Sequence, residues 1–166
     1  MSYIKKIRSL ASEAPKRIVL SEGCDDRVVK AAIEATAAGL GQMTLVGPLS
    51  TIKNKIYNFL PKERAKLSRS EIKIVDPRDS DLKHEFAKCY IERRKGKDIG
   101  LEDALEMVSS PLVFSALMVH LNYADGTVGG AASTTTETVR TAMQVLGIRK
   151  DKERLSSFFI MVCEKS

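Results

Sequence analysis

One stretch of this sequence places small and hydroxyl-bearing side chains beside an arginine, a combination that suits the binding of an anion. Residues 125–140 read DGTVGGAASTTTETVR and are almost free of bulky side chains. Glycine and alanine let a ligand approach the main chain, hydroxyl groups donate hydrogen bonds, and an arginine forks onto a phosphate or carboxylate. We therefore interpret the stretch as a loop that holds an anion.

The loop is expected to lead into a helix over about residues 135–146. The N-terminus of such a helix adds unpaired amides and a partial positive charge. Ser133, Thr135 and Thr136 add hydroxyl donors beside it. Arg140 follows Thr136 by four residues, so both lie on one helical face. These serine, threonine and arginine side chains are the candidate ligands of the anion.

A structural explanation of the same stretch stays open. Thr134 and Glu137 fit the T-x-x-E capping box, in which each side chain satisfies a backbone donor of the first helical turn. The glycines would then serve only a tight turn, and Glu137 would pair with Arg140. The stretch matches neither the P-loop pattern nor G-x-G-x-x-G, which disfavours a P-loop ATPase and a standard dinucleotide site.

Other side chains offer little catalytic chemistry. His84 and His120 are the only histidines, and the helical pattern around His120 predicts packing rather than a base oriented by Asp125. We interpret Asp125 as a turn residue. Cys24 stands at a predicted helix start, but the two acids that follow it disfavour a reactive thiolate. No carboxylate pair or His/Cys cluster has metal-ligand spacing, so we expect neither a metal nor a cofactor.

Length and composition indicate one globular domain. The chain has 166 residues, of which 43% are hydrophobic, enough for a buried core. No segment approaches the roughly 18 consecutive apolar residues of a membrane span, and the N-terminus lacks the apolar run of a signal peptide. The cysteines, Cys24, Cys89 and Cys163, are widely spaced, so neither a disulfide framework nor a zinc site is expected. We expect a cytoplasmic protein.

The net charge of +6 is compatible with nucleic acid or with an anionic small molecule as partner. Proteins that bind single-stranded nucleic acid pair basic residues with aromatic side chains that stack on bases. This chain has no Trp, and its four Tyr and five Phe are not interleaved with basic runs. We therefore favour the small molecule and expect no nucleic acid and no membrane as partner.

Alternating strands and helices are predicted to position the loop. Buried strands are expected at residues 17–20, 43–46 and 72–75. Helices are expected between Asp25 and Gly39, and over residues 49–59, 81–95, 101–108 and 112–121. A last apolar strand is expected at 157–162. This order predicts an α/β domain with a largely parallel sheet covered on both faces, and a ligand site beyond the carboxyl ends of its strands.

Several segments together resemble one enzyme family. Residues 124–144, ADGTVGGAASTTTETVRTAMQ, resemble the signature of phosphate acetyltransferases (phosphotransacetylases) and the related phosphate butyryltransferases. Further segments agree with the family in the same order: RIVLSEGCDDRVVKAA from Arg17, TLVG from Thr44, IVDP from Ile74, ERRKGKDIGLEDA from Glu92 and SSFFIMV from Ser156. The resemblance covers nearly the whole chain.

The resemblance implies both a fold and a reaction. Family members have two α/β domains related to the isocitrate and isopropylmalate dehydrogenase fold, an active site between the domains, and commonly a dimeric state. They transfer an acetyl group between acetyl phosphate and coenzyme A, which serves as a substrate rather than a cofactor. By this resemblance residues 1–150 correspond to the first domain and residues 151–166 to the first strand of a second.

The resemblance also assigns residues. Arg140 matches the family arginine after the Ser/Thr block, and Arg94 matches the arginine of an R-K-x-K-G segment; both family arginines handle coenzyme A or phosphate. This sequence departs from the family at Asp98, in place of the last glycine of that segment, and at Thr141, where proline is usual.

From this match we expect a division of roles. Ser133, Thr135, Thr136 and Arg140 would bind the phosphoryl group, and Arg94 a phosphate of coenzyme A. The alternative for Arg94 is a solvated basic patch with its lysine and arginine neighbours.

The family chain is considerably longer than this one. Its catalytic aspartate, which takes the thiol proton of coenzyme A, and a neighbouring serine and arginine lie near its C-terminus, beyond the part that this sequence resembles. We therefore expect a fragment, a split or truncated gene product, or one half of a heteromer, working as a homodimer or with a missing second half and showing little activity alone. The alternatives are a non-catalytic phosphate-binding or assembly module and a nicotinamide-dependent dehydrogenase.

Overall fold

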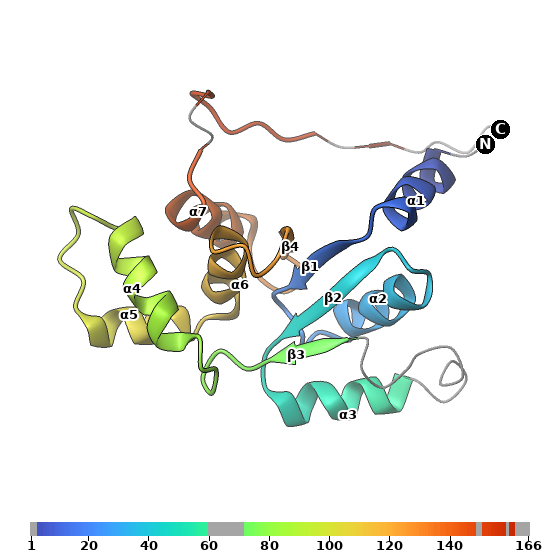
Figure 1. Cartoon of the computed structure of the whole chain (residues 1–166), viewed down its shortest axis with the longest axis horizontal. Helices are drawn as coiled ribbons and strands as arrows, with labels where there is room; N and C mark the ends of the chain where they lie inside the picture. The colour runs from blue at the N-terminus through green and yellow to red at the C-terminus, as the bar shows by residue number, and fades with distance from the viewer. Residues whose placement is uncertain (1–2, 60–71, 149–150, 159, 162–166) are drawn as a thin grey trace.

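A four-stranded parallel sheet forms the centre of the molecule in the computed structural model, which describes residues 3–59, 72–148, 151–158 and 160–161 (Figure 1). The strands are β1 (Lys16–Leu20), β2 (Gly41–Val46), β3 (Lys73–Val75) and β4 (Gly126–Val128). They lie in the order β3-β2-β1-β4, and each neighbouring pair is parallel. The predicted α/β class and the first three strands are confirmed.

Helices cover both faces of this sheet, as expected for parallel strands joined by crossovers. The helices are α1 (Tyr3–Glu13), α2 (Asp26–Ala37), α3 (Leu49–Phe59), α4 (Lys83–Arg93), α5 (Leu101–Val108), α6 (Pro111–His120) and α7 (Thr135–Val145). Helices α2 and α3 lie against one face, and α4 to α7 gather on the other (Figure 1). In the part of the chain that the structure describes, no helix has the length and apolar character needed to cross a membrane.

The two faces build two separate cores. Successive side chains of a strand point to opposite faces, so Leu20 packs with α2 and α3 whereas Val19 packs with α6 and its neighbours. In the same way, Leu45 packs in the core with α2 and α3, and Val46 packs in the core with α6 and its neighbours. Strands that bury both faces read as continuous apolar runs, which is why the sequence pattern located them.

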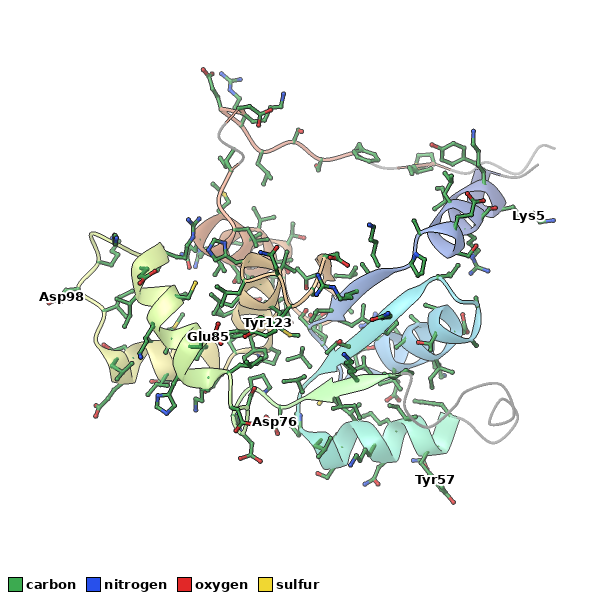
Figure 2. All side chains as sticks on the ribbon, viewed as in Figure 1. Lys5, Tyr57, Asp76, Glu85, Asp98 and Tyr123 are labelled. Atoms are coloured by element: carbon green, nitrogen blue, oxygen red, sulfur yellow. The ribbon has the colours of Figure 1, made fainter. Side chains whose placement is uncertain are left out.

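Side chains of α4 and of the segment after α6 meet within the larger core. Phe86 packs against Phe114, with ring centroids 4.7 Å apart, and against Tyr123 at 5.7 Å. The Tyr123 hydroxyl donates to Glu85 Oε2 at 2.9 Å, and Figure 2 shows the two labelled side chains pointing toward each other. This hydrogen bond is the main reason that the pKa of Tyr123 is raised. Helix α4 is thereby fixed to the segment that leads into β4.

Two elements of the fold were not predicted. Helix α1 has no buried residue, so its lead-in sequence carries no core pattern that would reveal it. Strand β4 has three residues, two of them exposed, and lies inside the stretch that we interpreted as a loop. Its strand character comes from pairing with β1, in which Leu20 lies opposite Val128, and not from its own side chains.

The strand expected at 157–162 is not seen in the described residues of that range. Residues 157, 158, 160 and 161 are irregular, and residues 159 and 162 lie outside the described part of the chain. Phe158 and Met161 are 84% and 81% exposed, so this segment packs on none of the described strands. A strand requires a partner for its backbone donors and acceptors, which the described sheet does not supply here. The division into two domains stays a prediction.

An ion pair fixes β4 beside β1. Arg17 Nη2 donates to Asp125 Oδ1 at 2.7 Å, and Arg17 Nε and the Arg17 amide donate to Asp125 Oδ2 at 3.2 and 2.9 Å. The Asp125 amide returns a hydrogen bond to the Arg17 carbonyl at 2.8 Å. The side-chain hydrogen bond from Arg17 is the main cause that lowers the pKa of Asp125 to about 2. Asp125 thus aligns two strands.

The Asp125→Asn variant tests this alignment through its pH dependence. A carboxyl whose pKa falls from 3.8 to about 2 on folding stabilises the fold above pH 3.8, and this contribution is lost as the pH falls toward 2. We expect the variant to be less stable than the parent at pH 7, with the difference shrinking below pH 4. Urea unfolding midpoints from pH 7 to pH 2.5 measure this, and a difference that stays constant would contradict it.

Candidate functional site

A cavity of about 630 Å³ opens where β1 and β2 end. Its wall comes from residues 21–25 after β1, residues 46–48 at the end of β2, residues 110–113 around the start of α6, and Met107. Helix α7 and the loop before it complete the wall with Ala132, Ser133, Glu137, Arg140, Thr141 and Gln144. This is the edge of a parallel sheet at which ligands bind, as the sequence predicted.

The starts of four helices meet around this cavity. Asp25 precedes α2, Pro48 precedes α3, Ser110 precedes α6 and Ser133 lies just before α7, and all four line the wall. Each helix presents its positive dipole end there. The Ser110 side chain makes no capping hydrogen bond to α6. Four converging N-termini favour an anion over a cation in this cavity.

The glycine-rich loop does hold an anion, and that anion is the carboxylate of Glu22. The Ala131 amide donates to Glu22 Oε2 at 2.6 Å, and the Ala132 and Ser133 amides donate to Oε1 at 2.9 and 2.6 Å. Three successive amides around one carboxylate form an anion-binding concavity of the kind found in phosphate sites. The loop amides that we expected to face a ligand are therefore engaged within the chain.

The environment of Glu22 keeps its carboxyl ionised. Partial burial alone would raise the pKa of Glu22, but hydrogen bonds from the Ala132 and Ser133 amides, the Ser133 hydroxyl and the Ala131 amide lower it by more. The net effect is a lowered pKa. Glu22 is not among the site residues that we predicted from the sequence. The available signal was an acid placed directly after a buried strand, at the sheet edge where such sites form.

The glycines of the loop serve close packing. A Cβ at Gly129 would lie 2.6 Å from Ser21 Oγ and 3.1 Å from Leu112 Cδ2, too close for any other residue without a shift. Gly130 has a φ of +98°, which other residues rarely adopt. We expected these glycines to admit a ligand to the main chain. At Gly129 the absence of a side chain instead makes room for Ser21, the residue after β1.

The predicted capping box of α7 is confirmed. The Glu137 amide donates to Thr134 Oγ1 at 3.2 Å, and the Thr134 amide donates to Glu137 Oε2 at 2.9 Å. The pKa of Glu137 is lowered, first by the Thr134 amide, then by the Thr134 hydroxyl and to a smaller degree by the charge of Arg140. Glu137 and Arg140 do not form the direct ion pair that we considered.

The third acid on the wall, Asp25, is also engaged. Asp25 caps α2 by accepting from the Arg27 amide at 2.8 Å, and it binds the Arg27 guanidinium through Nε at 3.0 Å and Nη2 at 2.7 Å. The Arg27 side chain is the main reason that the pKa of Asp25 is lowered to about 2. Arg27 Nη2 also donates to the Ala131 carbonyl at 2.5 Å. The exposed Cys24 lines the cavity beside Asp25.

The structure brings two of the predicted site residues together. Ser133 and Arg140 both line the cavity. Thr135 and Thr136 are exposed in the first turn of α7 but do not contribute to the wall, and Arg94 lies outside it at the C-terminal cap of α4. Within the described chain, Arg140 forms neither a hydrogen bond nor an ion pair.

The basic segment around Arg94 is partly structural. Arg93 donates to the Val145 carbonyl at 2.7 Å and to the Leu146 carbonyl at 3.2 Å, and so caps the end of α7. Arg94 is half-buried, and its Nε has no hydrogen-bond partner. Asp98 lies on the outer side of the connection between α4 and α5 (Figure 2). Arg93 is thus part of the fold, whereas both roles considered for Arg94 stay predictions.

Comparison with known proteins decides the family. A family model described as phosphate acetyl/butaryl transferase matches residues 2–166. The chain belongs to this family. The phosphate acetyltransferase of Thermoanaerobacterium thermosaccharolyticum is 35% identical over 97% of this chain and 47% of its own length. That of Acetivibrio thermocellus is 33% identical over 98% and 46%.

Solved structures of the phosphate acetyltransferase family agree with this assignment. A phosphotransacetylase from Streptococcus pyogenes superposes with a TM-score of 0.81 at 29% identity, covering 93% of this chain and 46% of that one. One from Staphylococcus aureus gives a TM-score of 0.77 at 28% identity, covering 91% and 45%. The chain thus spans about half the length of these relatives. The family resemblance inferred from the sequence is confirmed.

The close approach at Gly129 yields a test of the loop geometry. We expect Gly129→Ala to destabilise the fold by about 1–3 kcal/mol, because its Cβ would overlap Ser21 Oγ. Gly126→Ala is the matched control, since its Cβ would make an ordinary contact at 3.6 Å with Ile18 Cδ1. Urea unfolding of both variants at pH 7 measures the difference. Equal stability of the two variants would contradict this packing.

Proposed function

We propose that the cavity binds the phosphoryl group of an acyl phosphate, in an enzyme that transfers an acetyl group between acetyl phosphate and coenzyme A. The observation that carries the proposal is the position of Ser133 and Arg140 on one wall of a cavity faced by four helix N-termini. Membership of the phosphate acetyltransferase family supports the choice of anion.

The hydrogen bonds of the charged side chains on the cavity wall support the same choice. Glu22 is bound by three amides, Asp25 by Arg27, and Glu137 by Thr134. Among the described lining residues, Arg140 is the only lysine or arginine. Because each acid already accepts hydrogen bonds from within the chain, whereas Arg140 has no partner among the described residues, the guanidinium is the charged group left free to bind a ligand.

The remaining predicted ligands are assigned to parts of the substrates that extend beyond the cavity. We assign Arg94, at the C-terminal cap of α4, to a phosphate of coenzyme A, and its match to the family arginine supports this role. Thr135 and Thr136 are exposed just beyond Ser133, where their hydroxyls would reach ligand atoms at the rim.

The reaction explains why a cation and helix N-termini suit this site. A thiolate attacks the carbonyl carbon of the acyl phosphate, the carbon–oxygen bond to phosphate breaks, and phosphate leaves with the bonding electrons. Negative charge grows on the phosphate oxygens during this step. A guanidinium and helix dipoles fixed in place stabilise that charge without reorganising. The thiol proton passes to a base that we do not assign to any described residue.

Family membership supports proposals on the fold kinship, the location and the assembly of this protein. We propose kinship with the isocitrate and isopropylmalate dehydrogenase fold, a cytoplasmic location, and a site completed by a second domain or second chain in a dimer. The relatives' greater length supports this arrangement, because this chain spans about half of each. Coenzyme A enters as a substrate, and the proposed chemistry uses no metal or resident cofactor.

The Arg140→Ala variant tests the proposed function. A hydrogen bond to a charged group contributes about 1.5–3 kcal/mol, so we expect the affinity for acetyl phosphate to fall about ten- to a hundredfold. Titration calorimetry with the parent chain and the variant measures this. Arg8→Ala, on the exposed face of α1, is the control with the same change in net charge. Equal affinity of the Arg140→Ala variant and the parent would refute the proposal.

A further inference from the structure

Glu22 belongs to the cavity wall, and its carboxylate is bound by backbone amides of the chain itself. Its two oxygens accept from the amides of Ala131, Ala132 and Ser133 at 2.6 to 2.9 Å. These partners are 109 to 111 residues away along the chain. The contact therefore joins the loop after β1 to the loop after β4, across the edge of the sheet at which the cavity opens.

Two further contacts reinforce this junction. The Ser21 amide donates to the Val128 carbonyl at 3.2 Å, which extends the pairing of β1 and β4 by one step. On the other side of Glu22, Arg27 donates to the Ala131 carbonyl. The segment from Val128 to Ser133 is thus held at its start and along its length by residues 21–27.

The position of α7 depends on this held segment. Ser133 is bound to Glu22 through its amide and stands immediately before Thr134, the N-cap of α7. A helix is rigid over its first turns, so fixing its N-cap fixes the place of a side chain less than two turns later. That side chain is Arg140. The carboxylate of Glu22 and the guanidinium of Arg140 are linked through the backbone without touching.

We infer that Glu22 is a positioning residue for the anion site: its carboxylate holds the amides of Ala131 to Ser133 and so sets Ser133 and Arg140 on the cavity wall. The inference rests on the proposed function, since it takes Arg140 as the ligand-binding cation. Glu22 makes no contact with the reacting atoms. The loop that we first interpreted as a ligand cradle is instead preorganised by an internal carboxylate.

A positioning role and a simple electrostatic role of Glu22 predict opposite effects of its neutralisation on phosphate affinity. If Glu22 were only a negative charge near the ligand, its neutralisation would strengthen phosphate binding. The same holds if Glu22 occupied the place that phosphate takes in the functional protein. A positioning role predicts weaker binding, because the amides lose an acceptor and the start of α7 loses its anchor.

The decisive variant is Glu22→Gln in the full chain, with inorganic phosphate as the calorimetric probe. We expect phosphate affinity to fall at least fivefold. In the Arg140→Ala background the same change is expected to cause a smaller loss than in the parent, because Glu22 acts in part through that arginine. Glu106→Gln, an equal change of charge on the exposed side of α5 beside the cavity-lining Met107, is expected to leave affinity within twofold of the parent.

Amide hydrogen exchange of the parent chain provides a test that does not depend on a folded variant. The amides of residues 131–133 are expected to exchange slowly, and to stay protected when phosphate is added. Rapid exchange without phosphate, or loss of protection on its addition, would overturn the inference. In Glu22→Gln these three amides are expected to exchange faster while amides within β1 and β2 do not change.

The outcomes separate the inference from the proposed function. Equal phosphate affinity of the parent and Arg140→Ala would refute the proposed function. If Arg140→Ala lost affinity but Glu22→Gln bound phosphate as tightly as the parent or more tightly, only the positioning role would be wrong.

Discussion

The carboxylate of Glu22, bound by three consecutive amides, is the contact on which the geometry of the candidate site depends. Backbone amides of a packed loop need a hydrogen-bond acceptor, and these three amides precede the N-cap of α7. This chain supplies that acceptor from the end of its central strand. The constraint fixes the loop after β4, and with it the start of α7, against the carboxyl edge of the sheet. Arg17 and Asp125 play the matching role at the other end of β4.

The two explanations of the threonine-rich stretch, capping and anion binding, are compatible in this molecule. Thr134 and Glu137 satisfy the first turn of α7, and Glu22 satisfies the loop before it. What remains for a ligand is Arg140, together with the dipoles of four helices. On the proposed function, the capacity to bind an anion lies in one side chain and in the placement of helix ends, and less in the glycine-rich main chain than the sequence suggested.

Elements that bury a regular apolar pattern were predictable, such as β1, β2 and α5. Helix α1 buries nothing, and β4 owes its strand character to pairing with β1, so neither has a local signal. In the same way, Thr134 and Glu137 are three residues apart and were found from spacing, whereas the partners of Glu22 are more than a hundred residues away. Family resemblance identified Arg140 and Arg94, but only the fold separates the one on the cavity wall from the one outside it.

A crystal structure of the chain with bound phosphate tests the central claim most directly. Phosphate oxygens are expected within hydrogen-bond distance of Arg140, while Glu22 still accepts from the amides of residues 131–133. Phosphate seated in those amides with Glu22 displaced, or phosphate bound away from Arg140, would contradict it.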